Sequence, residues 1–376
     1  MLKAVEADTL VAAKQRYVAL DGLRGVAAYM VVISHYIGSD YKGAGLTILA
    51  PLHLAGQVGV MLFFVISGFL MGELYMQTPC TKENVRAFYV KRIARVVPLF
   101  YLIVLVSFTL FVARHNVWPL YYVDRLWPFM LFWNGGNNVL WTIPVEVQFY
   151  AVFPLIWWAF SKAGNAIMIL LIIICATIGA SGATTPALFN SFLPFFAAGL
   201  LLSVVEIPYS RLMEFLTIPA FALLIIGLPE VSTAMGFKPT GLWSSPFYLA
   251  LVPTTVLLIV KSRLAGIVLG SKIATFAGAI SYSVYLLHMP THFVLRQLPF
   301  YDTAPLLFIC VALVGATVVA WLSYRFIENP ARRWVSRFAS ARVTRRHSRR
   351  GVIELATDTP ARSHGDGNRC SCPDLS

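Results

Sequence analysis

Long apolar runs separated by short polar stretches dominate the chain. Each run holds about 17–22 mainly apolar residues, enough for one helix to cross the hydrocarbon core of a bilayer. Between the third and fourth runs, residues 118–133 are rich in Trp, Tyr and Pro, which is typical of a membrane–water interface. The pattern predicts an all-α, polytopic integral membrane protein with about ten transmembrane helices. The runs lie at 20–38, 57–76, 97–113, 144–161, 165–181, 188–205, 212–228, 245–260, 273–294 and 304–326.

The composition supports a membrane protein over a large soluble core. Of the 376 residues, 58% are hydrophobic and only 12% are charged. A soluble domain would carry about 25% charged residues. The formal net charge of +13 could indicate a nucleic-acid partner. The positions of the basic residues decide this question.

Lysine and arginine fall mainly on one side of the predicted membrane. With ten spans and both termini inside, the inner segments hold 25 of the 30 basic residues and the outer segments hold five. This asymmetry follows the positive-inside rule, so we predict that both termini are cytoplasmic. The basic residues would then contact anionic membrane lipids, and no nucleic acid is expected.

The two ends of the chain differ from its apolar body. The first twenty residues mix polar and apolar types, so we expect no cleavable signal peptide. Residues 337–376 hold few apolar side chains and many Arg, Ser and Gly, which is typical of disorder. We therefore predict a transmembrane domain over residues 1–336 and a basic, disordered cytoplasmic tail over residues 337–376.

The first span carries an ionisable group near each end, in R-G-V-A-A-Y-M-V-V-I-S-H at 24–35. Eleven residues turn a helix by about 1100°, within about 20° of three full turns, so Arg24 and His35 share a face about 16 Å apart. Arg24 then lies near the cytoplasmic surface and His35 in the outer half of the membrane. A histidine at that depth faces a bundle interior, as a functional group or as a structural one bonded to a backbone carbonyl.

Two further spans place ionisable side chains at a similar outer depth. Glu146 opens the fourth span from the outside, and His288 lies toward the outer end of the ninth. A histidine and a carboxylate within reach of each other form a general base, although Glu146 could instead cap its helix. His288 and His292 have the i, i+4 spacing of metal ligands. Pro290 lies between them and no third ligand is evident, so no metal is predicted.

The inner side of the predicted bundle carries a group of arginines. K-R-I-A-R-V-V-P at 91–98 places Arg92 and Arg95 on one helical face at the start of the third span. Together with Arg24 they would form a cluster at the cytoplasmic mouth. Guanidinium forks suit phosphate and pyrophosphate groups. Anchoring of the membrane edge by positive charge is the alternative interpretation.

An ordered set of motifs resembles the acyltransferase-3 family of integral membrane acyltransferases. One departure lies in W-T-I-P-V-E, where family members usually have Ser near position 142 and no Pro at 144; Thr142 keeps the hydroxyl. The set covers roughly residues 17–335. In order, the motifs are L-D-G-L-R-G-V-A-A-Y-M-V-V-I-S-H at 20–35, F-F-V-I-S-G-F-L at 63–70, K-R-I-A-R-V-V-P at 91–98, W-T-I-P-V-E-V-Q-F-Y at 141–150, S-Y-S-V-Y-L-L-H at 281–288 and F-I-E-N-P at 326–330.

This resemblance implies a membrane O-acyltransferase in the bacterial cytoplasmic (inner) membrane. Such a protein transfers an acyl group, often acetyl, from cytoplasmic acetyl-CoA or another acyl-CoA to a hydroxyl. The acceptor would be a cell-surface or exported glycan, free or lipid-linked. The family's common extracytoplasmic hydrolase-like domain has no counterpart here, so the chain is expected to finish the transfer itself or to use a partner.

The resemblance also implies roles for particular residues. Three arginines would receive the phosphates of CoA, and three other residues would take part in catalysis, with a histidine of the first span at the centre and a carboxylate assisting it. Ser67, Gly68 and Phe69 would allow close helix packing beside the acyl path. The implied residues are Arg24, Arg92 and Arg95 for the phosphates and His35, Glu146 and His288 for catalysis.

Two other interpretations share the same features. A transporter or flippase would also carry ionisable residues at mid-membrane depth. An acyltransferase for a small metabolite, such as a macrolide, would share the donor site and differ only in its acceptor. The ordered motifs and the arginine cluster favour acyl transfer, and the loops at 38–56 and 229–244 are the predicted outward-facing segments.

Overall fold

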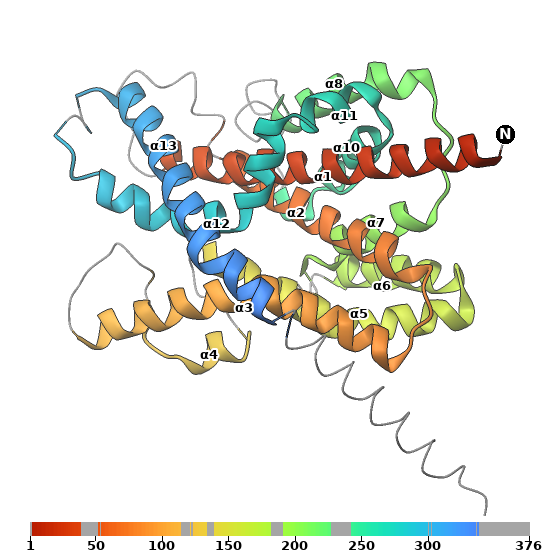
Figure 1. Ribbon diagram of the computed structural model, residues 1–376, viewed down its shortest axis with the longest axis horizontal. Helices are drawn as coiled ribbons and strands as arrows, with labels where there is room; N and C mark the ends of the chain where they lie inside the picture. Colours follow the sequence, from red (N-terminus) through yellow and green to blue (C-terminus); the bar gives the residue numbers. More distant parts are fainter. Residues whose placement is uncertain are drawn as a thin grey trace, which may run out of the picture.

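The structure, a computed structural model, is mainly helical in its described part (Figure 1). It describes residues 2–38, 52, 54–113, 121, 123–133, 139–181, 191–226, 242–299, 301, 303–335 and 337. No strand occurs within those ranges. The elements are α1 (Leu2–Gly38), α2 (Ala55–Met71), η2 (Gly72–Met76), α3 (Lys82–Val112), α4 (Trp127–Met130), η3 (Val139–Trp141), α5 (Thr142–Ala163), α6 (Ala166–Ser181), α7 (Leu193–Val204), α8 (Arg211–Ile226), η5 (Leu242–Ser244), α10 (Pro246–Lys261), α11 (Arg263–Leu269), α12 (Lys272–Leu295), α13 (Pro305–Ser323) and η6 (Tyr324–Glu328).

The predicted all-α class is confirmed, and each of the ten apolar runs overlaps a helix, although the runs at 20–38 and 97–113 cover only about the second half of α1 and of α3. Not every helix is long enough to cross a membrane. Five described helices have the length and apolar character of a span, or six if the bent pair α10–α11 is one span. Helix α7, at 12 residues, extends about 18 Å, less than the ~30 Å of a hydrocarbon core. The bend of 89° between α10 and α11 likewise shortens the distance that these two helices together extend in one direction.

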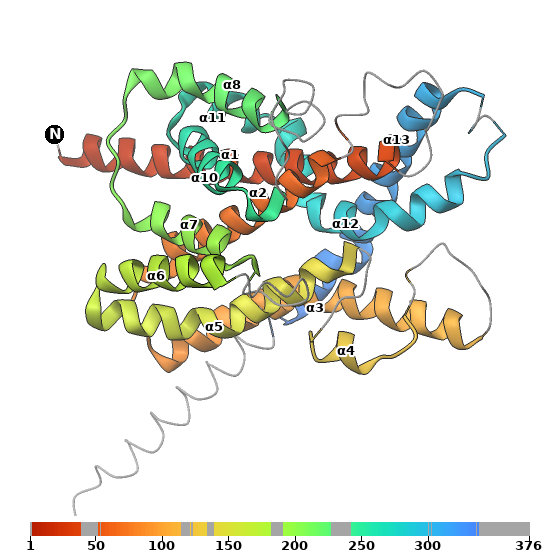
Figure 2. The ribbon, with the colours of Figure 1, turned by 180° about the vertical axis from the view of Figure 1, so that it is seen from behind.

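Helices α1, α2 and α12 form the centre of the molecule (Figure 2). The closest approach of α1 and α12 depends on Gly278, because a Cβ there would lie 2.0 Å from the carbonyl oxygen of Asp21. Helices α2 and α7 approach in the same way at Gly68, where a Cβ would lie 2.1 Å from the carbonyl oxygen of Phe196. The predicted close packing at Gly68 is therefore confirmed. Such contacts between small residues are typical of helices that associate in lipid.

The outer helices expose apolar side chains. Within the most apolar part of each span, 72% of α2 is buried, against 33% of α3 and 33% of α13. Large apolar residues such as Leu105 and Val112 on α3 and Leu306 and Val314 on α13 are exposed. A soluble protein rarely exposes apolar surface over several whole helices. These faces fit the acyl chains of a bilayer, which supports the predicted membrane protein.

Helix α3 begins earlier than the apolar pattern predicts. It starts at Lys82, after Thr81, whose hydroxyl accepts a hydrogen bond from the Asn84 N–H at 3.3 Å. At 1.5 Å per residue, Arg92 and Arg95 lie about 15 and 20 Å along the helix rather than at its beginning. The apolar run marked only the second half of the helix because its first three turns carry charged residues. The two arginines can therefore reach the interior of the bundle.

Two predicted features fall on residues that the structure does not describe. The basic tail predicted over residues 337–376 lies outside the described residues apart from residue 337. The outward-facing segments predicted at 38–56 and 229–244 lie mostly outside them as well.

Candidate active site

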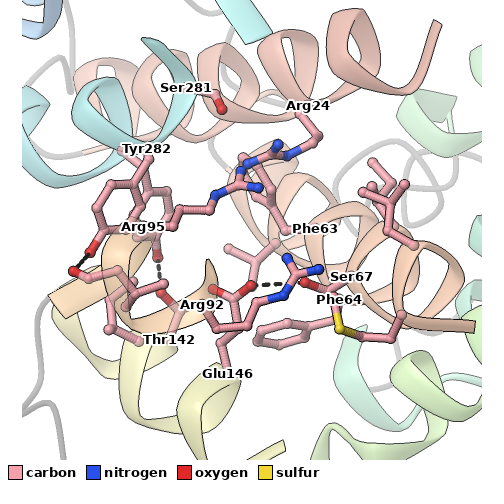
Figure 3. Close-up of a pocket in the computed structure, with 17 residues that line it drawn as sticks. Arg24, Phe63, Phe64, Ser67, Arg92, Arg95, Thr142, Glu146, Ser281 and Tyr282 are labelled. Atoms are coloured by element: carbon pink, nitrogen blue, oxygen red, sulfur yellow. Dashed lines mark hydrogen bonds between the residues drawn. The ribbon is translucent and has the colours of Figure 1, made fainter. Parts of the chain in front are cut away.

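A pocket with an empty volume of about 690 Å³ lies inside the bundle (Figure 3). Its polar lining comes from five helices and includes Arg24 of α1, Ser67 of α2, Arg92 and Arg95 of α3, and Glu146 of α5. The structure thus brings the three predicted arginines together. We call this space the arginine pocket. Its lining has three guanidinium groups against one carboxylate, an excess of positive charge.

Arg92 is a buried cation, with only 9% of its surface exposed. Its guanidinium lies over the rings of Phe88 and Tyr150, at 5.8 Å and 5.6 Å from the ring centroids. Among the described residues, no hydrogen-bond partner reaches its Nε atom. A buried charge without full compensation is costly, so this guanidinium is suited to receive an anion from a ligand.

The other two arginines have acidic neighbours. The Arg24 Nη1 atom lies 3.8 Å from the Asp21 Oδ1 atom, one turn earlier on α1. Arg95 lies close enough to Asp21 and Glu328 to interact with both electrostatically. Asp21 and Glu328 therefore offset part of the positive charge from outside the pocket, since neither lines it.

Glu146 lies among the arginines, whereas the sequence predicted it at the depth of His35. Its Oε1 atom accepts hydrogen bonds from Ser67, at 2.8 Å, and from the Tyr150 hydroxyl. The sequence analysis missed both partners. Tyr150 could have been found, because it lies four residues after Glu146 on the same helical face. Ser67 is far from Glu146 in sequence, so only the packing of α2 on α5 reveals it.

His35 and His288 contact each other, as their predicted depths required. The His288 Nε2 atom lies 3.4 Å from the His35 Nδ1 atom. His35 Nδ1 is also 2.8 Å from the Val31 carbonyl oxygen, and His288 Nδ1 is 2.8 Å from that of Tyr285. Carbonyl oxygens only accept, so in the neutral rings both Nδ1 atoms carry the proton. His35 then has its basic lone pair on Nε2. We call these two residues the histidine pair.

Aromatic rings enclose the histidine pair. The Tyr36 hydroxyl donates to the His288 carbonyl oxygen at 3.2 Å, and the Tyr36 ring stacks on His292 with centroids 4.5 Å apart. His292 therefore packs as part of an aromatic wall. Within the described part of the chain, no three His, Cys, Asp or Glu side chains gather in a way that could hold a metal ion.

Tyr285 joins the histidine pair to the arginine pocket. Its side chain lines the pocket with Thr142, and the two hydroxyl oxygens lie 3.0 Å apart. Its backbone carbonyl accepts the hydrogen bond from His288. An arginine-rich region and a pair of imidazole rings are thus separated by a single residue.

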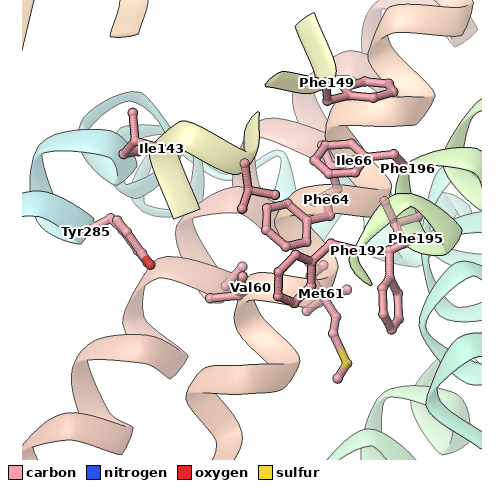
Figure 4. Close-up of a cluster of buried hydrophobic side chains, with 14 of the residues drawn as sticks. Val60, Met61, Phe64, Ile66, Ile143, Phe149, Phe192, Phe195, Phe196 and Tyr285 are labelled. Atoms are coloured by element: carbon pink, nitrogen blue, oxygen red, sulfur yellow. The ribbon is translucent and has the colours of Figure 1, made fainter. Parts of the chain in front are cut away.

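Packed phenylalanines support the opposite wall of the pocket (Figure 4). Phe64 lines the pocket and packs on Phe196 of α7, with ring centroids 4.7 Å apart. Phe149 of α5 stacks on the same ring at 4.1 Å. This apolar contact between α2, α5 and α7 holds Ser67 and Glu146 on neighbouring helices within hydrogen-bonding distance.

The apolar helices and the polar site inside them define a helical membrane protein with an internal ligand pocket. The chain belongs to the acyltransferase-3 family, since the family model, described as an acyltransferase domain, matches residues 17–325. The family predicted from the ordered motifs is therefore confirmed.

Known relatives are bacterial proteins. The chain is 27% identical to the O-acetyltransferase OatA of Staphylococcus aureus (strain NCTC 8325) over 362 residues, covering 84% of this chain and 57% of the relative. It is 24% identical to a putative O-acetyltransferase of S. aureus (strain COL) over 376 residues, covering 85% and 58%. The chain thus spans less than two thirds of the length of these relatives. No solved structure matches it.

Proposed function

We propose that this protein is a membrane O-acetyltransferase that moves an acetyl group from cytoplasmic acetyl-CoA to a hydroxyl of a cell-surface or exported glycan. The observation that carries the proposal is the meeting of Arg24, Arg92 and Arg95 in one pocket beside the histidine pair. The names of the relatives support acetyl as the transferred group and oxygen as its acceptor.

The arginine pocket suits an acyl-CoA donor in charge and in its apolar lining. CoA carries a pyrophosphate and a further phosphate, which bidentate guanidinium groups bind well. Apolar lining residues such as Val60, Phe63 and Ile143 would contact the pantetheine arm and the acyl group.

The histidine pair supplies a base for the transfer. His35 Nε2 would take the proton of the acceptor hydroxyl while its oxygen attacks the thioester carbonyl carbon. The C–S bond then breaks, and the CoA thiolate takes the proton from His35. His288 Nε2, 3.4 Å from His35 Nδ1, would stabilise the imidazolium by accepting its other N–H. A transient acyl group on His35 is the alternative route.

Glu146 takes a different part in this proposal from the one implied by the family. Its carboxylate accepts hydrogen bonds from Ser67 and Tyr150, and the Tyr150 ring lies under the Arg92 guanidinium. We assign Glu146 to positioning Arg92 through Tyr150 and to balancing part of the positive charge of the pocket. Assistance to His35 would have to act through the acceptor or through water.

Ten spans with both termini in the cytoplasm remain our proposed topology. The 25-to-5 distribution of basic residues supports it. The helices that are too short to cross alone, such as α7, would lie within the bundle. This topology places the arginine pocket on the cytoplasmic path of the donor in the bacterial inner membrane.

The test uses purified protein in liposomes, with labelled acetyl-CoA on the cytoplasmic side and an isolated surface glycan on the other. We expect label in the glycan, with CoA released in equal amount, and no transfer by the His35→Gln variant. A transporter or flippase would move a solute without forming an ester. If the protein acetylated a small metabolite but no glycan, it would still be an acetyltransferase, with a different class of acceptor.

A further inference from the structure

We propose that the Tyr285 hydroxyl is a further catalytic group, which donates a hydrogen bond to the thioester carbonyl oxygen as that atom gains negative charge. Thr142 holds and directs this hydroxyl. The inference rests on the proposed function, because it concerns the step in which the acetyl group leaves CoA.

The location of Tyr285 favours this role. The residue is 6% exposed and lines the arginine pocket, one helical turn before His288 on α12. Its carbonyl oxygen accepts from His288 Nδ1 at 2.8 Å, and its ring lies 6.0 Å from Phe63. If the CoA phosphates lie at the arginines and the base is His35, the thioester would lie between the two regions, where Tyr285 is located.

The other described hydroxyls of the pocket are committed to protein acceptors. Ser67 donates to Glu146, Ser281 to the Gly278 carbonyl oxygen at 2.8 Å, and Tyr282 to the Val96 carbonyl oxygen at 2.6 Å. A hydroxyl has one proton to donate. These three groups are therefore poor donors to a ligand.

The hydroxyls of Thr142 and Tyr285 differ from these three, because together they have a single backbone acceptor, the Val139 carbonyl oxygen. The Thr142 oxygen lies 3.0 Å from the Tyr285 oxygen and 3.2 Å from the Val139 carbonyl oxygen. In one arrangement Thr142 donates to Val139 and Tyr285 donates to Thr142, so each proton has an acceptor within the protein. In the other, Thr142 donates to Tyr285, and the phenolic proton is available to a ligand oxygen.

The chemical step conserves atoms and charge. The acceptor oxygen bonds to the carbonyl carbon, its proton moves to His35 Nε2, and the carbonyl electron pair moves onto oxygen. Tyr285 keeps its proton and only donates a hydrogen bond to that oxyanion. When the C–S bond breaks, the carbonyl re-forms and the thiolate takes the proton from His35. Loss of one such donor typically lowers kcat by about 10²–10³-fold.

The test is Tyr285→Phe in the liposome assay, which removes the hydroxyl and keeps the ring. We expect kcat to fall by about 10²–10³-fold, with the KM for acetyl-CoA and the binding of CoA nearly unchanged. The matched control is Tyr248→Phe, since Tyr248 is also buried and its hydroxyl reaches a backbone carbonyl, that of Leu224, at 3.5 Å. Tyr248→Phe should keep normal kcat.

Thr142 provides an independent readout if Tyr285→Phe fails to accumulate. Thr142→Val should lower kcat about tenfold or more, whereas Thr142→Ser should keep it, because only the hydroxyl is needed. Retention of more than half of kcat in Tyr285→Phe, or loss of CoA binding together with kcat, would overturn the catalytic role. If His35→Gln still abolished transfer in that case, the proposed function would stand. No transfer by the unaltered protein would overturn the function itself.

Discussion

The arginine pocket draws its polar groups from five helices, whereas α1 and α12 alone build the histidine pair. In the pocket, the buried Arg92 lacks full hydrogen bonding among the described residues. In the histidine pair, backbone carbonyls of the same helices fix both rings. The arginine pocket is suited to bind a negatively charged ligand. In the histidine pair, the backbone carbonyls hold each neutral ring in one tautomer. Mutations should therefore separate donor binding from the transfer step.

The largest expected effect is that of His35→Gln. Glutamine can donate to the Val31 carbonyl in place of Nδ1, but it cannot accept a proton at neutral pH. We expect acetyl transfer to fall by about 10²–10⁴-fold, while protein level and CoA binding stay nearly normal. The measurement is transfer of labelled acetyl to the glycan. Substantial activity of this variant would show that His35 is a structural residue and that the histidine pair does not supply the base.

Arg95→Ala should produce the opposite result, a change in donor binding. A charge-assisted hydrogen bond to phosphate contributes about 1.5–3 kcal/mol, so the KM for acetyl-CoA should rise by about 10- to 150-fold. Arg95→Lys should restore it only in part, since lysine lacks the bidentate fork. The control is Arg125→Ala, whose side chain is 71% exposed and lies outside the pocket. Normal donor dependence in Ala variants at 24, 92 and 95 would leave these arginines as membrane anchors.

The pH dependence of transfer should belong to the histidine pair alone. Neutral His35 is the active form, so kcat should fall by at most about tenfold per pH unit as acidification protonates it. Arg95→Ala should show the same acid limb, because a guanidinium does not titrate in this range. A flat pH profile, or loss of the acid limb in Arg95→Ala, would contradict the assignment of the pH dependence to the histidine pair.

The smallest expected effect concerns the contact that brings α1 and α12 together. In Gly278→Ala the new Cβ would meet the Asp21 carbonyl oxygen at 2.0 Å. Such overpacking costs about 1–3 kcal/mol, so the unfolding temperature in detergent should drop. Gly266→Ala is the matched control, because nothing lies within 4 Å of a Cβ there, and it should be neutral or slightly stabilising. Equal changes in unfolding temperature for the two variants would show that the close α1–α12 contact at Gly278 does not limit stability.

The sequence alone determined which segments are helical, which family the chain belongs to, and which residues carry charge inside apolar helices. A long apolar run leaves a membrane chain few choices other than a helix, because backbone groups must hydrogen-bond within the segment. Helical periodicity also placed Arg24 and His35 on one face of α1. That face does turn inward, with Arg24 in the pocket and His35 on His288.

Only the tertiary structure decided which side chains meet. It placed Glu146 with Ser67 and Tyr150, set Arg92 and Arg95 deep along α3, and put Tyr285 between the two regions. The period of a helix fixes the direction of a side chain, but the partner on the facing helix depends on register and depth. Those follow from close contacts between residues far apart in sequence, such as Gly68 against Phe196 and Gly278 against Asp21. Steric fit between helices, which no single segment encodes, therefore assembled the site.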